Sequence, residues 1–380
     1  MRNFQDSDDP FIFIRKVFVG FGCSTIIMYY SRLIFIFHTL SLLLESYHVI
    51  TNFSLDIITQ YGSAMSLMLY SITSQFLLIC EQNLITEVVE ECKSFFWTMD
   101  FLSFIKQTQI LKDMTKIKRK MYLSWIWFVV FGIALLPVWG DYNEMFLFPF
   151  IYQTYFGNWS PLFYYFHASS FPFLAYIAIR IPAFILYLTL ALHFQTLLLN
   201  QKILQIPQNK SGNQEDIFRN LCSCISHHVA LKKFVTKTQQ SIQKMIPVYF
   251  VLAILCLVAV MYSCLNSLAM STSNHFKVRG FFGGVCGVVV LYTFAEAGQL
   301  QADTTGEVFN TLMQCSWYNW NNRNQKILLL FMVNSLKPSY IDWGGVIVGY
   351  SFGSSVIKTC YSYALVLYKL KISKEQNVTF

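Results

Sequence analysis

Long apolar blocks separated by polar and charged segments dominate the pattern along this chain. About 20 mostly apolar residues are what an α-helix needs to cross the hydrocarbon core of a bilayer. The pattern predicts seven such helices, at about residues 17–46, 61–80, 123–148, 172–200, 246–270, 280–300 and 343–370. No internal repeat is visible, which disfavours a transporter built from inverted repeats. The expected fold class is an all-α integral membrane protein.

Composition supports the membrane assignment. The chain is 55% hydrophobic and 13% charged, whereas a soluble domain carries roughly 25% charged residues. The net charge of +8 could suggest a nucleic-acid partner. The basic residues, however, lie between the apolar blocks, where membrane topology places them. We therefore expect membrane lipid, and no nucleic acid, around this protein.

The distribution of Lys and Arg predicts the orientation. Segments 1–16, 81–122, 201–245 and 301–342 together hold 20 of these residues, against about five in the segments on the other side. Basic residues favour the cytoplasmic side, so we expect the N-terminus in the cytoplasm and the C-terminus outside. The possible glycosylation sites at Asn52, Asn158 and Asn377 then lie outside, whereas the one at Asn209 lies inside and is read as a chance match.

The chain lacks the sequence motifs that several other classes of protein require. G-protein-coupled receptors have the opposite orientation, and the chain has neither an acidic-Arg-Tyr triplet after the third predicted helix nor an Asn-Pro-x-x-Tyr near its end. No catalytic triad, phosphate-binding loop or dinucleotide fingerprint is present, so we expect no enzyme and no cofactor. Cys222 and Cys224 with His227 and His228 fit no standard zinc spacing, so we expect no metal.

The cytoplasmic segments carry apolar residues at near-helical spacing in 81–122, 215–245 and 305–335. The helices are therefore expected to continue below the membrane, either as simple extensions or as a subunit interface. The expected organisation is six membrane helices in 1–300, a cytoplasmic anchor helix in 301–342, and a last membrane helix in 343–380.

A set of short motifs in the last third of the chain carries a family resemblance. They are Tyr292-Thr-Phe-Ala-Glu-Ala-Gly-Gln-Leu300, Glu307, Ser316-Trp-Tyr318, Arg323 to Leu330, Ser335-Leu-Lys-Pro-Ser339, Gly344-Gly345 and Lys358-Thr-Cys-Tyr-Ser-Tyr363. In order and spacing this set resembles the C-terminal region of insect odorant receptors. The related gustatory receptors end with Thr-Tyr, five residues and Gln-Phe, whereas this chain has Ser362-Tyr363, five residues and Lys369-Leu370.

The resemblance implies a subunit of an odorant-gated, non-selective cation channel in the plasma membrane of olfactory sensory neurons. The chain looks like the tuning subunit, which binds a small volatile odorant and forms a heterotetramer with the odorant receptor co-receptor. A homomeric channel of the gustatory type is the alternative. In the family, the last helix lines the pore, the cytoplasmic helices hold the subunits together, and the odorant pocket lies in the outer half of the bundle.

One face of the last predicted helix is polar. Ser355, Thr359, Ser362, Val366 and Lys369 recur every three or four residues, so they share a helical face. Such a stripe can line a pore or pack small residues against another helix. Val366 matches the family's apolar gate, with Leu370 close by. Lys369 can repel cations at the outer mouth or extend to the lipid interface.

The candidate pocket residues come from the outer halves of four predicted helices, at the depth where the family binds odorants. They are Met65, Leu69, Tyr70, Thr73, Leu136, Trp139, Tyr176, Ile177, Arg180, Met261, Tyr262 and Leu265. Each alone can equally be a packing residue. The aromatic segment 149–171 is interpreted either as a lid over the pocket or as an interfacial aromatic belt.

Overall fold

The computed structural model describes residues 5–141, 143–206, 213–269, 273–343 and 345–378, and this part is almost entirely helical. The helices are α1 Ile12–Arg15, α2 Thr25–Thr51, α3 Leu55–Cys80, α4 Gln82–Phe95, α5 Phe104–Ala134, α6 Phe148–Phe156, α7 Ser160–Leu204, α8 Gln214–Ala269, α9 Asn274–Met313, α10 Asn322–Ser335 and α11 Tyr350–Val378. A π-helical segment covers Lys16–Phe21, and short 3-10 turns cover Asp6–Asp8, Met99–Phe101, Gly157–Trp159 and Trp317–Asn319. A small antiparallel hairpin pairs β1 Asp342–Trp343 with β2 Val346–Ile347.

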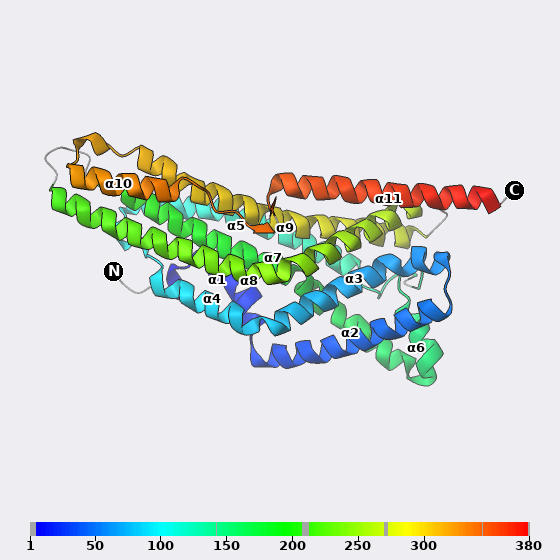
Figure 1. The fold of residues 1–380 in the computed structure, drawn as a ribbon. Coiled ribbons are helices and arrows are strands. Elements are labelled where there is room, and N and C mark those ends of the chain that lie inside the picture. The colour runs from blue at the N-terminus through cyan, green and yellow to red at the C-terminus, as the bar shows by residue number, and fades with distance from the viewer. Residues whose placement is uncertain (1–4, 142, 207–212, 270–272, 344, 379–380) are drawn as a thin grey trace.

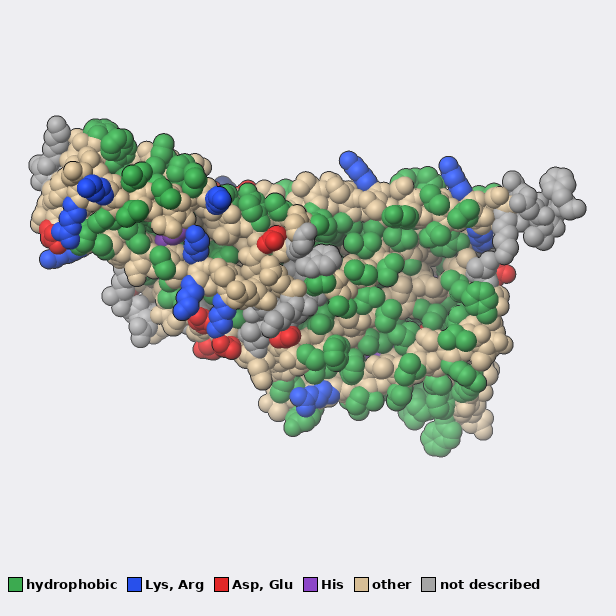
Figure 2. Space-filling model, in the orientation of Figure 1, with side chains coloured by type: hydrophobic (Ala, Val, Ile, Leu, Met, Phe, Trp, Pro, Cys, Tyr) green, Lys and Arg blue, Asp and Glu red, His purple; other side chains and the backbone are tan. Residues whose placement is uncertain are grey.

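The helices form an elongated bundle whose two halves differ in surface chemistry. Five described stretches are long and apolar enough to cross a membrane, namely Thr25–Thr51, Asp56–Cys80, Phe148–Leu204, Pro247–Ser267 and Asn274–Met313. α5 packs on α9, and α11 runs along one edge of the same bundle against α8 and α9 (Figure 1). In Figure 2 apolar side chains cover the half that contains α11, while most charged side chains lie on the other half. The all-α membrane fold is thereby confirmed, and its orientation stays a prediction.

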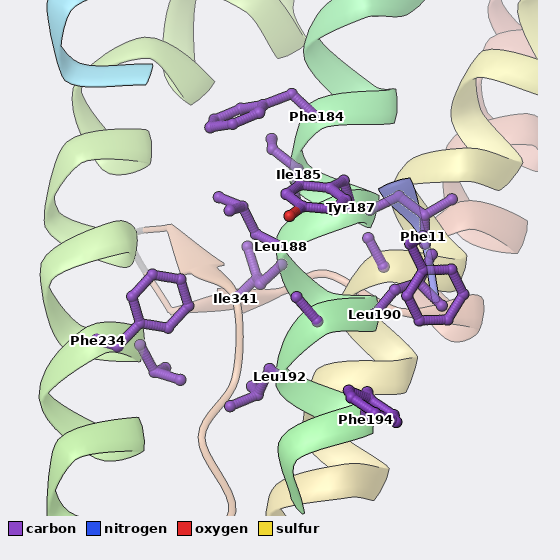
Figure 3. Packing of buried hydrophobic residues seen from close by; sticks show 14 of the residues in the cluster. Phe11, Phe184, Ile185, Tyr187, Leu188, Leu190, Leu192, Phe194, Phe234 and Ile341 are labelled. Atoms are coloured by element: carbon purple, nitrogen blue, oxygen red, sulfur yellow. The ribbon is translucent and has the colours of Figure 1, made fainter. Parts of the chain in front are cut away.

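α7 is the central helix of the bundle. It packs against α9, α3, α8, α5 and α1, and its residues from 177 to 192 are all buried. Figure 3 shows its side chains meeting Phe11 from the N-terminal segment, Phe234 from α8 and Ile341 from the segment before the hairpin. Because α7 is apolar all round, it suits the centre of the bundle rather than a surface.

The first membrane helix begins later than the sequence indicated. Residues 17–24, predicted within it, lie outside α2, and Lys16–Phe21 instead folds into the bundle together with α1. Phe11, Ile14 and Phe18 supply the apolar face of this N-terminal segment and are almost fully buried. Gly22 permits the close approach, because a Cβ there would lie 2.2 Å from Cζ of Arg180 on α7.

The third predicted helix has different bounds as well. α5 begins at Phe104 in the charged segment and ends at Ala134, whereas the pattern predicted 123–148. Pro137 cannot donate a backbone hydrogen bond, and Gly140 adopts a positive φ of 60°, so the chain leaves the helix here. Residues 135–141 and 143–147 follow an irregular path between α5 and α6.

The charged half of the molecule is built from continuations of the long helices. α8 has 56 residues and α9 has 40, so both extend beyond their predicted membrane segments. α10 packs on both of them. The predicted anchor segment 301–342 is not one helix, because it contains the end of α9, a 3-10 turn and α10. Lys237 of α8 contacts Glu87 of α4 at 2.8 Å, an exposed ion pair between these two helices.

Candidate ligand cavity

A cavity of about 150 Å³ lies inside the apolar half of the bundle. α3, α5, α7, α8 and α9 provide most of its wall, together with residues 145–148; α2 contributes Glu45 and α11 contributes Val356. An apolar cavity of roughly this volume can hold a molecule the size of benzene. The space therefore suits one small organic molecule.

The wall of the cavity is apolar with a few polar groups. Its aromatic side chains are Phe128, Phe146, Phe148, Phe171, Phe250 and Phe294 together with Tyr70 and Tyr249. Hydroxyls come from Ser63, Ser71 and Ser263, and Glu45 is the charged side chain in the described wall. Binding sites for small ligands commonly combine an apolar wall with a small number of orienting polar groups.

Glycines of α9 make room for the cavity. Gly280, Gly283 and Gly287 follow one another at helical spacing and all line it. A Cβ at Gly283 would meet Leu135 at 3.6 Å, an ordinary contact, so a larger side chain there would extend into the available space. This small-residue face is visible in the sequence as three glycines spaced three and four residues apart.

Tyr70 is the residue of the predicted pocket that lines this cavity. Its ring is buried, and its hydroxyl donates to the carbonyl oxygen of Ala178 on α7 at 3.1 Å. Its predicted neighbours on α3 point elsewhere. Met65 packs in an aromatic cluster with α6, and Leu69 is exposed, while Thr73 is half-buried outside the wall.

Tyr176 and Arg180 of α7 do not line the cavity. Their side chains bind the N-terminal segment instead. The Tyr176 hydroxyl donates to the carbonyl oxygen of Val17 at 2.8 Å, and Arg180 Nε donates to that of Phe18 at 2.9 Å. Their predicted companion Ile177 is buried in the main core.

Leu136 and Trp139 follow the end of α5 and lie outside the described wall. The guanidinium carbon of Arg279 lies 4.5 Å from the centroid of the Trp139 ring. The Trp139 indole donates to the carbonyl oxygen of Ala134 at 3.1 Å, so this residue closes the end of α5.

On α8, the residues that line the cavity are not the predicted ones but their neighbours in the sequence. Ile254, Leu257, Val260 and Ser263 line the cavity, whereas Met261, Tyr262 and Leu265 do not. Successive residues of a helix point about 100° apart, so the predicted residues lie on a different face of α8 from the residues that line this cavity. Met261 packs instead against the buried cluster that α8 shares with α11.

The predicted pore residues of α11 share an outward face. Ser355, Thr359, Ser362, Val366, Lys369 and Leu370 are exposed in the single chain. The opposite face of α11, with Val356, Cys360 and Ala364, is buried against the bundle. The predicted lid segment 149–171 begins at α6, and its Phe171 belongs to the cavity wall beside Phe148.

Glu45 and Val356 line the cavity but were not among the pocket residues predicted from the sequence. Glu45 is a single acidic residue in the apolar run of α2, and such residues are a known signal of function in membrane helices. Val356 is apolar within a helix that we interpreted through its polar stripe, so the pattern held no signal for it.

Comparison with known proteins places the chain in a family. The sequence model of the family described as 7tm Odorant receptor matches residues 103–361. The chain belongs to the odorant receptor family. It is thus a multi-pass membrane protein, and the resemblance seen in its C-terminal motifs is confirmed.

Solved structures of odorant receptors share this fold. The insect olfactory receptor OR5 from Machilis hrabei is 13% identical, with a TM-score of 0.72, and the match covers 91% of this chain and 90% of that one. The same receptor in complex with eugenol is 12% identical, with a TM-score of 0.63 and the same coverage. No curated protein matches the chain.

Proposed function

We propose that this chain is the odorant-binding subunit of a ligand-gated, non-selective cation channel. It assembles with the odorant receptor co-receptor in a heterotetramer in the plasma membrane of olfactory sensory neurons. A small volatile compound in the cavity opens the channel. The eugenol complex of the OR5 receptor supports this, because a receptor of the same fold binds a small aromatic molecule.

The observation that carries the proposal is that the cavity reaches α11. Val356 lines the cavity and belongs to a buried cluster with Leu257 of α8, Leu291 of α9 and Cys360 of α11. A ligand can shift a conformational equilibrium only by contacting the two states differently. Contact with Val356 gives a bound odorant direct access to the position of α11.

The outer face of α11 completes the proposed channel. Helix α11 lies along the edge of the bundle in Figure 1, where a neighbouring subunit can pack. Its exposed polar stripe would line the pore, with Val366 and Leu370 as an apolar constriction that blocks ions by dewetting. Lys369 would stand at the outer mouth and lower the conductance for cations.

Recording currents from cultured cells tests the proposal. Cells that express this chain with the co-receptor should respond to members of a panel of small volatiles, and cells that express either chain alone should respond much less. Substituting Val356→Ala should lower the maximal current with unchanged surface expression. An equally large odorant current from this chain alone would instead support the homomeric, gustatory-type channel.

A further inference from the structure

Glu45 places a carboxyl group in the wall of an otherwise apolar cavity. The side chain is 3% exposed, and it lies on the face of α2 that points into the bundle. Among the residues that the structure describes it forms no ion pair. A buried carboxylate without a cation is costly, because little in the cavity replaces its lost hydration.

A chain of hydrogen bonds aims donors at this carboxyl group. The Ser41 hydroxyl donates to Glu45 Oε1 at 3.3 Å, and the Tyr152 hydroxyl donates to Ser41 Oγ at 2.8 Å. Since the Tyr152 proton is used there, its oxygen accepts from His167 Nδ1 at 2.7 Å. All three donors therefore point toward Glu45, and its carboxyl group is the acceptor at the end of this chain of hydrogen bonds.

A second polar group in the same wall lacks a partner. The Ser63 hydroxyl oxygen on α3 is buried and, within the described residues, has no hydrogen-bond partner. Such groups usually find a partner in a folded protein or its ligand. Glu45 and Ser63 thus offer the cavity two acceptors in an aromatic surrounding that includes Phe146 and Phe148.

We propose that Glu45 makes this receptor selective for small protonated amines with a compact apolar body. The ammonium group would pair with the Glu45 carboxylate and donate to Ser63 Oγ, and the ring faces of the wall would add cation–π attraction. The apolar body would fill the rest of the cavity. This assignment rests on the proposed odorant-gated function and names the ligand class for it.

Matched pairs of ligands separate charge from shape. The probes are benzylamine with benzyl alcohol, and hexylamine with 1-hexanol, each tested as dose–response curves on the chain co-expressed with the co-receptor. The parent should respond to at least one amine at a concentration about tenfold to a hundredfold below that for its alcohol, the range expected of a charge-assisted hydrogen bond. Equal or better responses to the alcohols would overturn the assignment while leaving odorant gating intact.

Substitution at Glu45 tests the residue itself. Glu45→Gln keeps the size and hydrogen-bonding capacity but removes the charge, so the ratio of amine potency to alcohol potency should fall from about tenfold or more to about one. Glu45→Asp keeps the charge and should retain part of the preference. Asp56→Asn, an exposed acidic position on α3, is the matched control and should behave like the parent. An unchanged amine preference in Glu45→Gln, at equal surface expression, would refute the role of Glu45.

A binding measurement tests the proposed amine selectivity separately from the proposed channel function. If no volatile evokes current, the proposed channel function falls, and thermal unfolding of the purified chain then decides the ligand class. Benzylamine or hexylamine should raise the unfolding temperature of the parent but not of Glu45→Gln. No rise in the parent would refute the amine site independently of any current.

Discussion

Tyr70 of α3 and Tyr249 of α8 bring their hydroxyl groups together and share one acceptor, the carbonyl oxygen of Ala178 on α7. Each hydroxyl lies 3.1 Å from that oxygen, and the two ring centroids are 5.1 Å apart. Both rings also line the cavity. The pair joins three helices in the wall of the cavity, so it can influence both the shape of the site and its rigidity.

Trimming Tyr70 should therefore weaken odorant responses. Tyr70→Ala removes an aromatic wall, and we expect a loss of about 1–3 kcal/mol, roughly tenfold to a hundredfold in potency. Tyr70→Phe keeps the ring and should change potency far less. Tyr262→Ala is the control on α8, because Tyr262 lies outside the described wall. Dose–response curves in the co-expressed channel give the answer, and a larger loss in Tyr262→Ala would favour the pocket predicted from the sequence.

A larger side chain on α9 that extends into the cavity should prevent ligand binding. Gly283→Leu projects a side chain into the space, and we expect the response to every ligand to fall by at least about tenfold, because a ligand must then displace packed atoms. Gly284→Leu is a matched control on the next residue, which is outside the wall. Both changes remove one helical glycine, so both gain about 0.5–1 kcal/mol of helix stability. Similar currents from the two variants would contradict the cavity as the binding site.

Opening the proposed constriction should produce a leak. Val366→Ser replaces an exposed apolar side chain of α11 by a small polar one, which makes wetting easier. The basal current in the absence of odorant should rise. Leu367→Ser, one residue along the helix, serves as a comparison because its side chain points about 100° away. Unchanged basal current and blocker sensitivity in Val366→Ser would remove Val366 from the constriction.

Acid should destabilise the charged half of the molecule through His227. Its ring stacks on Trp97 with centroids 3.8 Å apart, and burial lowers the pKa of His227 from 6.5 to about 3. The unfolded chain binds this proton near pH 6.5 and the folded chain does not, so stability is complete above pH 6.5 and falls as the pH drops toward 3.

We therefore expect the unfolding temperature of the purified chain to fall between pH 7 and pH 5. His227→Phe keeps a ring on Trp97 but cannot bind a proton, so it should reduce this fall. His228, whose pKa burial lowers to about 4, acts in the same direction. Substituting both histidines should make the unfolding temperature still less dependent on pH. If the unfolding temperature of the parent does not fall between pH 7 and pH 5, the mechanism is contradicted.

Each of the seven apolar blocks overlaps a helix of the structure. Such blocks can be recognised because length and hydropathy are properties of one segment and do not depend on its neighbours in the fold. Proline and glycine explain the bounds that differed. Pro137 and Gly140 end α5 earlier than the apolar block suggests, and Gly22 lets the N-terminal segment turn into the bundle. The block from 17 to 46 looked continuous because a buried segment and a membrane helix are equally apolar.

The cavity was less predictable because it depends on which face each helix turns inward. Tyr70 was predicted and lies in the wall, whereas Met261 and Tyr262 follow the wall residue Val260 by one and two residues and point about 100° and 200° away from it. A rotation of 100° leaves the hydropathy of an apolar helix unchanged, so no sequence pattern could detect it. Glu45 did carry a signal, as the single acidic residue in an apolar run.

The bonds that Tyr176 and Arg180 make to the N-terminal segment end on the main-chain oxygens of Val17 and Phe18. Every amino acid presents that oxygen, so these two bonds do not depend on which side chains stand at the two positions. Evolution can therefore vary Val17 and Phe18, within the limits of their packing, without undoing the attachment. Gly22 has less freedom, because a side chain there would displace the guanidinium of Arg180 from the position in which it bonds Phe18. Among receptors that retain this arginine, the docked N-terminal segment should diverge in sequence around one fixed glycine.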